Sequence, residues 1–337
     1  MTMDFRGKRV TVVGIARSGA GAANLLSSLG AEITVTDRRP AHELEEFLSR
    51  LLPEVKKEAG GHPEQLFTEA DLIVISPGVP LSIPPLKRAA ERGIPIIGEL
   101  ELAYMTVNSP QATVDSQRAE FLAITGTNGK STTTMLVSEM MKAGGFNTLL
   151  GGNIGYALTE EIYERVKGQG SRVKKEEDEG KGELAPLSLS SLDPGPLPLD
   201  PLFIIAEVSS FQLETIASFR PKGATILNIT PDHLDRYSSM EEYTDAKCRV
   251  FMNQGAGDFL LLNADDPMTG EIVKRVKGQG SKVQEEKNRG QGMPEIYFFS
   301  REKEVKGAWF KDGVIRFNLP GLADFSLQPS AFPIQGV

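Results

Sequence analysis

The stretch that decides the fold is Glu120-Phe-Leu-Ala-Ile-Thr-Gly-Thr-Asn-Gly-Lys-Ser-Thr132. Its apolar start predicts a buried strand, and the segment from Thr132 to Ala143 predicts a helix. Between them, glycines allow a tight turn whose backbone N–H groups point toward a bound anion at the start of the helix. The stretch therefore predicts a phosphate-binding loop between a strand and a helix.

Two polar side chains make this loop a candidate ATP site. Lys130 can reach the β- and γ-phosphates, and the hydroxyl of Ser131 can bind Mg²⁺. The usual spacing of such loops needs a glycine at position 124, which is Ile124 here, so the loop is a shortened variant. The alternative is an ordinary glycine-rich turn. The residues predicted to bind ATP are Gly126, Thr127, Asn128, Gly129, Lys130, Ser131 and Thr132.

Three more apolar runs predict buried strands after the loop: Leu202 to Ala206, Gly223 to Leu227 and Phe259 to Leu262. Glu207 follows the first run, where a buried carboxylate needs a partner such as Mg²⁺; the alternative is a strand-end glutamate that faces solvent. His233 follows the second run, and a lone histidine is more often structural. Lys247 lies on a predicted helix, where a solvated lysine is the default.

The first hundred residues alternate strand-like and helix-like segments. Apolar runs predict strands at 9–13, 32–36, 71–75 and 94–97, and the segments 18–29, 42–52 and 86–92 predict helices. This alternation is typical of a doubly wound parallel sheet. We therefore expect an α/β protein: an N-terminal Rossmann-like parallel-sheet domain followed by a P-loop-type α/β ATP-binding domain.

A second candidate nucleotide loop lies in the N-terminal domain. The segment Gly14-Ile-Ala-Arg-Ser-Gly-Ala-Gly21 follows a strand and opens a helix, with Ala16 where the middle glycine of the dinucleotide fingerprint would stand. Asp37 ends the second strand, in the place of the acidic residue that binds a ribose in such folds. Tight packing of the helix against the sheet is the alternative.

The boundaries of the two domains follow from composition. The polar segment from Tyr104 to Arg118 predicts a linker, which gives domains at residues 1–107 and 108–337. The segments at about 167–201 and 276–293 are polar and predict disordered surface insertions. They share a phrase, Arg165-Val-Lys-Gly-Gln-Gly-Ser-Arg-Val173 and Arg275-Val-Lys-Gly-Gln-Gly-Ser-Lys-Val283, which we interpret as a duplicated loop insertion.

Composition excludes several classes of protein. The 337 residues carry a net charge of −8, which argues against a nucleic-acid partner. Cys248 is the only cysteine, so neither a disulfide framework nor a cysteine metal site is expected. With one cysteine, no signal peptide and no run of about 20 apolar residues, we expect a cytoplasmic protein without a membrane partner. We also expect a monomer.

Together these segments resemble the Mur ligases, and within them the members that add D-glutamate. The resemblance rests on the loop at 126–132, Gly152-Asn-Ile-Gly155, Glu207-Val-Ser-Ser-Phe-Gln-Leu-Glu214, Asn228 to Tyr237 and Asp245-Ala-Lys247, with Ser76-Pro-Gly78 and Gly98-Glu-Leu-Glu-Leu102 in the N-terminal domain. It implies an ATP-dependent ligase that joins D-glutamate to UDP-N-acetylmuramoyl-L-alanine through an acyl phosphate, in peptidoglycan precursor synthesis.

The resemblance also implies roles for single residues. Lys130, Glu207, His233 and Lys247 would be catalytic. Ser131 and Glu207 would hold one Mg²⁺, and His233 would hold a second together with Lys247 in the form of its carbamate. The UDP-substrate would contact Arg17, Ser18, Asp37, Arg38, Ser76 and Gly78 at its UDP end, and Asn153, Gln212 and His233 toward its muramoyl-alanine end.

The family has a third domain that binds the incoming amino acid. This chain stops at Pro333-Ile-Gln-Gly-Val337, about where that domain would begin, so we expect the C-terminal domain to be absent and the chain alone to ligate poorly. A remnant that binds UDP-sugar and ATP without ligase activity is one alternative. Another Mur-type ligase is a second, and a relative of folylpolyglutamate synthase is a third, although that branch lacks the N-terminal Rossmann-like domain.

Overall fold

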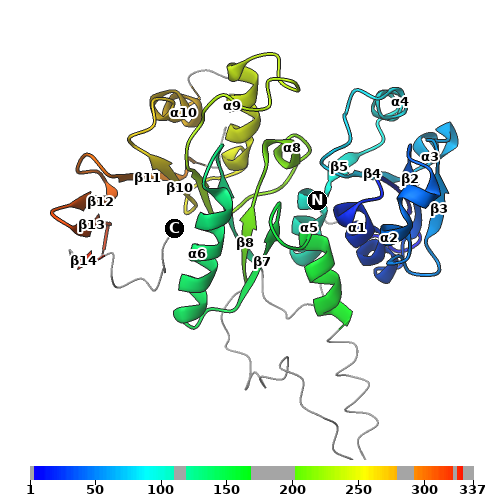
Figure 1. The fold of residues 1–337 in the computed structure, drawn as a ribbon, viewed down its shortest axis with the longest axis horizontal. Coiled ribbons are helices and arrows are strands. Elements are labelled where there is room, and N and C mark those ends of the chain that lie inside the picture. Colours follow the sequence, from blue (N-terminus) through cyan, green and yellow to red (C-terminus); the bar gives the residue numbers. More distant parts are fainter. Residues whose placement is uncertain (1–3, 110–118, 168–201, 279–291, 322–324, 329–337) are drawn as a thin grey trace, which may run out of the picture. The chain divides into compact units, whose positions relative to one another are not determined.

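The computed structural model describes residues 4–109, 119–167, 202–278, 292–321 and 325–328. Within these ranges the chain builds two sheets with helices around them (Figure 1). One sheet has five parallel strands and belongs to the N-terminal residues. The other has nine strands, and the loop at 126–129 follows one of them. The predicted α/β class, with a parallel-sheet domain followed by a second α/β sheet, is confirmed.

The five-stranded sheet has the order β3-β2-β1-β4-β5, and every neighbouring pair is parallel. Its chain order reverses between β1 and β4, which is the switch point where doubly wound sheets bind ligands. The strands are β1 (Arg9–Val13), β2 (Glu32–Asp37), β3 (Lys56–Ala59), β4 (Leu72–Ile75) and β5 (Ile96–Gly98). The helices are α1 (Arg17–Ser28), α2 (Glu45–Leu48), α3 (Glu64–Thr68), α4 (Pro84–Glu91) and α5 (Glu99–Val107), with a 3₁₀ turn η1 (Ala41–Glu43).

Both faces of this sheet carry a hydrophobic core, because strand residues alternate in direction. Val10 and Val12 of β1 pack on one face in a cluster with Leu26 of α1. Val13 and Ile73 pack on the other face. Burial on both faces explains why the central strands read as continuous apolar runs.

The nine-stranded sheet has the order β14-β13-β12-β11-β10-β9-β6-β8-β7. The pairs from β6 through β9, β10 and β11 to β12 are parallel, and β12, β13 and β14 continue as antiparallel strands at the far edge (Figure 1). The strands are β6 (Glu120–Thr125), β7 (Thr148–Gly152), β8 (Phe203–Glu207), β9 (Gly223–Ile226), β10 (Phe259–Asn263), β11 (Glu295–Ser300), β12 (Gly307–Lys311), β13 (Val314–Asn318) and β14 (Phe325–Leu327).

This order places three strand ends side by side. Strand β6 lies between β9 and β8, so the loop after β6 has the end of β9 on one side and the end of β8 on the other. The helices of this part of the chain are α6 (Lys130–Ala143), α8 (Ser210–Leu213), α9 (Met240–Cys248) and α10 (Thr269–Val276), with a 3₁₀ turn η2 (Arg249–Phe251) and a helix over residues 158–167.

Several local predictions were wrong. The helix expected over 42–52 is only the turn η1 and the four residues of α2. The N-terminal part of the expected linker, Tyr104 to Val107, belongs to helix α5, which buries Glu99 and Glu101 as well as its leucines. Those carboxylates accept hydrogen bonds from the backbone N–H groups of Thr159 and Ser218, at 2.8 Å each. Strands β3, β7 and β11 to β14 were not predicted at all.

The predicted insertions lie almost wholly outside the described residues, as does the linker from residue 110 to 118. The exceptions are residues 167, 276–278 and 292–293, of which 276 is the last residue of helix α10. In the described ranges, no helix combines the length and the apolar character that crossing a membrane requires.

Candidate functional site

The loop at 126–129 joins β6 to α6 in a conformation that requires its glycines. Gly126 has a φ of +151° and Gly129 a φ of +81°. A Cβ on Gly126 would lie 3.1 Å from the Cβ of Leu227. The first N–H groups of α6 have no carbonyl of a preceding turn to bond, so they form an anion site at the positive end of the helix. The predicted strand, turn and helix are therefore confirmed.

Asn228, two residues after the end of β9, holds this loop by hydrogen bonds. Asn228 accepts a hydrogen bond from the N–H of Thr127 through its backbone carbonyl, at 3.0 Å, and from the N–H of Asn128 through its side chain, at 2.8 Å. These two N–H groups are thus engaged within the protein. That the seven residues at 126–132 bind ATP stays a prediction, in which these two N–H groups would not contact a phosphate.

The side chains of the loop also reach protein partners. The amine of Lys130 donates to the carbonyl of Thr127 at 2.7 Å, so it folds over the loop. The hydroxyl of Ser131 donates to the carboxylate of Glu207 at 2.7 Å. Glu207 is buried at the end of β8. The structure therefore brings together the hydroxyl and the carboxylate that were predicted to share one Mg²⁺.

Lys247 is a fully buried lysine, with only 2% of its surface exposed. Its amine donates to the carbonyl of Gly126 at 2.9 Å and lies 4.7 Å from the centre of the Tyr243 ring. Burial, and secondarily the positive charge of Lys130, lowers the pKa of Lys247 from 10.5 to about 7. A substantial fraction of this amine is therefore neutral near pH 7, unlike that of a solvated lysine.

His233 sits in a strained backbone conformation beside an aromatic ring. Its φ is 54°, a left-handed value that is uncommon for residues other than glycine. Its carbonyl accepts hydrogen bonds from the N–H groups of Arg236 and Tyr237, at 3.0 Å each, which fix the turn. Its half-exposed ring lies 4.9 Å from the ring of Phe211, centre to centre. The turn thus presents the imidazole at the carboxyl end of β9.

Two features of this region were missed in the sequence. Tyr243 connects the candidates, because its ring lies under the Lys247 amine and 6.2 Å from the His233 ring, and its hydroxyl is 3.3 Å from that of Thr127. Its position four residues before Lys247 on α9 was the available signal. The second feature is the Glu214 carboxylate. It accepts hydrogen bonds from the side chains of Arg236 and Tyr237, in the turn after His233, at 2.6 Å each.

In the five-stranded sheet, the predicted UDP-binding residues gather at the carboxyl ends of β1, β2 and β4. Asp37 is buried and accepts hydrogen bonds from the N–H of Ile15 at 2.8 Å and from the guanidinium of Arg39 at 2.8 Å. Burial would raise the pKa of Asp37, but these bonds outweigh it and lower the pKa below its usual value. Asp37 thus shapes the loop after β1, and its partner is Arg39 rather than the exposed Arg38.

The other predicted residues of this edge fall into two groups. Ser76 is buried, and its hydroxyl donates to the carbonyl of Gly14 at 2.9 Å. Ser18 is half-buried and is the second residue of α1, directly after the loop that follows β1. Gly78 follows Ser76 by two residues, and a Cβ on it would meet open space. Arg17 begins α1, is exposed, and donates a short hydrogen bond to the carbonyl of Gly155. The edge therefore offers N–H, hydroxyl and guanidinium donors.

Asn153 and Gln212, predicted to contact the muramoyl-alanine end, differ in their settings. Asn153 is exposed after β7. Gln212 is buried and forms a capping box with Ser209: its side-chain oxygen accepts from the Ser209 N–H at 3.0 Å, and its own N–H donates to the Ser209 hydroxyl at 3.3 Å. The structure thus gives Gln212 a role in starting helix α8, and its substrate contact stays a prediction.

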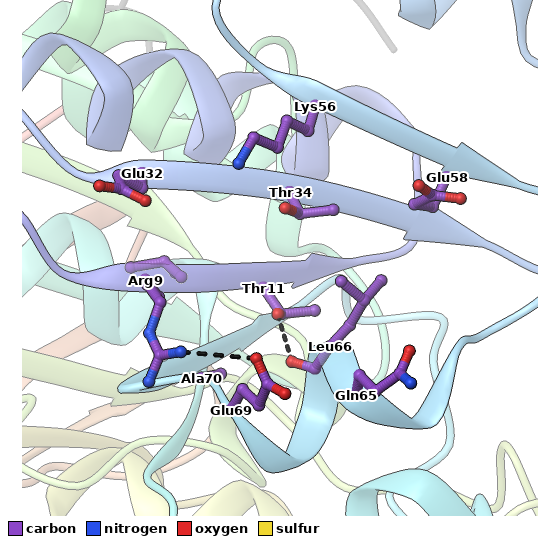
Figure 2. A pocket seen from close by; sticks show the side chains of 11 residues that line it. Arg9, Thr11, Glu32, Thr34, Lys56, Glu58, Gln65, Leu66, Glu69 and Ala70 are labelled. Atoms are coloured by element: carbon purple, nitrogen blue, oxygen red, sulfur yellow. Dashed lines mark hydrogen bonds and ion pairs between the residues drawn. The ribbon is translucent and has the colours of Figure 1, made fainter.

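A pocket in the described residues lies away from these edges. Figure 2 shows it on one face of the five-stranded sheet, between β1, β2, β3 and α3. It takes in Arg9, Glu32 and Lys56, the first residues of their strands, and the Arg9 guanidinium pairs with Glu69 at 3.5 Å. Since ligands of such sheets bind at the carboxyl ends of the strands, this mixed-charge pocket is not the candidate site.

Comparison with protein families gives two matches. The model "Mur ligase middle domain" matches residues 124–328, and the model "Mur ligase MurD-like, N-terminal domain" matches residues 8–98. The chain is similar to the UDP-N-acetylmuramoylalanine–D-glutamate ligase of Pelotomaculum thermopropionicum, with 39% identity over 95% of this chain and 58% of that protein. It is also similar to the ligase of the same name from Koribacter versatilis, with 40% identity over 94% of this chain and 58% of that protein.

Among solved structures, the fold is similar to that of the UDP-N-acetylmuramate:L-alanyl-gamma-D-glutamyl-meso-diaminopimelate ligase from Neisseria meningitides. The TM-score is 0.50 and the identity 14%, over 92% of this chain and 83% of that one, so this match concerns the fold alone. The chain spans 58% of the length of the two curated relatives named above.

Proposed function

The chain belongs to the Mur ligase family, and from this premise we propose that it binds ATP and UDP-N-acetylmuramoyl-L-alanine and serves the ATP-dependent addition of D-glutamate in peptidoglycan precursor synthesis. Relatives at 39–40% identity carry that activity in their names. The observation that carries the proposal is that the same loop has the buried amine of Lys247 on the carbonyl of Gly126 and, just after it, the hydrogen bond from Ser131 to Glu207. An ordinary glycine-rich turn has no need of such neighbours.

The proposed reaction has two steps. An oxygen of the substrate carboxylate attacks the γ-phosphorus of ATP, and ADP leaves as the acyl phosphate forms. The amine of D-glutamate then attacks the acyl carbon, inorganic phosphate leaves, and the amide nitrogen loses a proton. In this proposal the N–H groups from Gly129 to Thr132 and the amine of Lys130 bind the phosphates and orient the γ-phosphoryl group.

The residues present fit Mg²⁺ that arrives with a nucleotide. No cluster of three or more His, Cys, Asp or Glu side chains able to hold a metal occurs in the described ranges. Mg²⁺ commonly takes one or two carboxylates, phosphate oxygens and waters, so the Ser131 hydroxyl and the Glu207 carboxylate are a sufficient protein contribution. Bound there, Mg²⁺ would supply neutralisation of the phosphate charge. Glu207 and Ser131 would hold it.

Lys247 fits the proposed carbamate. A neutral amine attacks CO₂, forming a nitrogen–carbon bond and releasing one proton, and the product is a carboxylate. The pKa of about 7 keeps enough neutral amine for this step near neutral pH. A carbamylated Lys247 would offer the hard oxygen that an amine lacks, and together with His233 it would hold a second Mg²⁺.

The UDP end of the substrate would lie at the carboxyl edge of the five-stranded sheet. Arg17 and Ser18 begin helix α1, whose amino end favours anions such as a diphosphate. Asp37, Arg38, Ser76 and Gly78 would complete this end, and Asn153, Gln212 and His233 would contact the muramoyl-alanine end. The division into domains at 1–107 and 108–337, a monomeric state and a cytoplasmic location are part of the same proposal.

Binding calorimetry tests the proposal without requiring turnover by this chain. We expect Mg·ATP to bind, and UDP-N-acetylmuramoyl-L-alanine to bind more tightly than UDP-N-acetylmuramic acid, which lacks the alanine. In the Lys130→Ala variant, ATP affinity should fall by about 100-fold while the UDP-substrate affinity is kept, because a charge-assisted contact to phosphate is lost. A folded chain that binds neither ligand would refute the proposal.

A further inference from the structure

Asn228 stands where the register of the sheet brings it beside the phosphate loop. Strands β6 and β9 are parallel, and Thr125, the last residue of β6, pairs with Ile226, the last residue of β9. The two chains therefore leave the sheet together, and Asn228 follows β9 at the same distance as Thr127 follows β6. A side chain with both a donor and an acceptor at this point can bond the departing loop.

Asn228 bonds this loop through three of its polar groups. Its side-chain oxygen accepts from the N–H of Asn128 at 2.8 Å, and its side-chain nitrogen donates to the carbonyl of the same residue at 3.0 Å. Its backbone carbonyl accepts from the N–H of Thr127 at 3.0 Å. Thr230 adds a fourth bond, from its N–H to the hydroxyl of Thr127 at 3.0 Å. The amide thus bonds both backbone polar groups of Asn128, which belong to the two successive peptide units on either side of that residue.

These bonds have a consequence for anion binding. In a phosphate-binding turn, successive N–H groups converge on the ligand. Here the N–H groups of Thr127 and Asn128 bond the residue that follows β9, so a ligand would be bound by the N–H groups at the start of α6, from Gly129 onward. The shortened loop, which has Ile124 in place of the usual first glycine, is held by the residue that follows the neighbouring strand β9.

We propose that Asn228 is a positioning residue for nucleotide binding: its side-chain amide holds the loop at 126–129 in the shape that presents the N–H groups from Gly129 onward to the phosphates of a nucleoside polyphosphate. This inference rests on the proposed function. The loop carries two glycines with positive φ, whose unfolded conformations are numerous. Without the amide, a bound nucleotide would have to fix this backbone itself, and its affinity would fall accordingly.

The test compares Asn228→Ala with a matched control, Asn263→Ala. The amide of Asn263 also donates to the backbone of a neighbouring strand end, the carbonyl of Leu227, at 3.1 Å, but it does not bond the loop. Affinity for Mg·ATP and Mg·ADP is measured by calorimetry, folding by thermal unfolding, and loop order by amide hydrogen exchange in peptides that cover residues 126–129.

We expect Asn228→Ala to weaken ATP and ADP binding by about 10-fold, which corresponds to the cost of fixing the backbone of one residue. We also expect faster hydrogen exchange at Thr127 and Asn128 without nucleotide. Asn263→Ala should change neither. A folded Asn228→Ala variant that binds ATP within about twofold of wild type, in the same assay, overturns the inference.

The exchange measurement separates this inference from the proposed function. If the wild-type chain binds no ATP, the proposed function fails, and unchanged exchange in Asn228→Ala then also overturns the positioning role. If Asn228→Ala does not fold, Asn228→Asp replaces it under the same criteria. That variant keeps the acceptor for the Asn128 N–H but sets a carboxylate oxygen against the Asn128 carbonyl, so loop exchange should again be faster than in wild type.

Discussion

Lys247 should make the chain more stable as the pH rises. A lysine in a surface ion pair has the opposite effect, because its pKa is raised in the folded state. In the unfolded chain its amine holds a proton up to a pH near its ordinary pKa of 10.5, whereas in the folded chain it loses the proton near pH 7. Between these values the unfolded state binds one more proton than the folded state. The free energy of unfolding therefore rises with pH in this window.

The magnitude follows from the two pKa values. Each pH unit within the window contributes about 1.4 kcal/mol, so from about pH 7 to about pH 9 the wild-type chain should gain about 2 kcal/mol relative to a variant without the amine. Lys247→Met is that variant, because it keeps most of the buried apolar stem. Below the folded pKa, the wild type carries the full cost of a buried charge, so Lys247→Met should be the more stable protein there.

Urea unfolding of both proteins at several pH values, in buffer freed of CO₂, measures this difference. The removal of CO₂ prevents carbamylation, which would replace the titrating amine. Equal pH dependence of the two proteins would refute the argument that burial lowers this pKa. In buffer with ¹³C-bicarbonate, the wild type should show a carbamate resonance that Lys247→Met lacks.

Three further substitutions test other parts of the site. Glu207→Gln should weaken Mg·ATP binding by about 10-fold and change metal-free ATP binding little, since a neutral amide is a poorer Mg²⁺ ligand; equal losses with and without metal, by calorimetry, would contradict this role. Gly126→Ala should destabilise the chain by about 1–3 kcal/mol in urea unfolding, because the φ of +151° is strained for alanine and the added Cβ meets Leu227. Glu214→Ala should cost about 2–3 kcal/mol by the same assay, since it removes the acceptor of Arg236 and a tyrosine hydroxyl, and a loss below about 0.5 kcal/mol would show that this network contributes little.

The pairing of Ser131 with Glu207 was predicted through the resemblance to the Mur ligases, and the strand order gives its physical reason, since β6 and β8 are neighbours in the sheet. Apolar runs that end in polar residues mark the carboxyl ends of parallel strands, and these ends share one edge of the sheet. The burial of Lys247 could not be predicted in this way. Helix α9 is polar in composition, and only packing against the loop decides that the face with Tyr243 and Lys247 is the buried one.

Other errors had a local signal that was overlooked. Asp312 and Gly313 both have positive φ and form a two-residue turn between β12 and β13, where Lys311 pairs with Val314. An Asp-Gly pair between alternating residues is a strong hairpin signal. The partner of Asp37 is a different case: Arg38 and Arg39 are equivalent in sequence, and only the turn after β2 determines that Arg39 reaches the carboxylate.

The charges of the loop region connect two parts of the proposed function, the carbamate of Lys247 and the second Mg²⁺. Lys130 and Lys247 lie close enough for the charge of one to lower the pKa of the other. A bound polyphosphate would favour a protonated Lys247, and by reciprocity a protonated Lys247 would favour the polyphosphate. Carbamylation reverses the sign, because it replaces this amine with a carboxylate that repels phosphate. A carbamylated Lys247 and a nucleotide are therefore compatible in the proposed site only with cations between them. In the proposed site, carbamylation of Lys247 would therefore require a cation nearby, such as the second Mg²⁺ proposed beside His233.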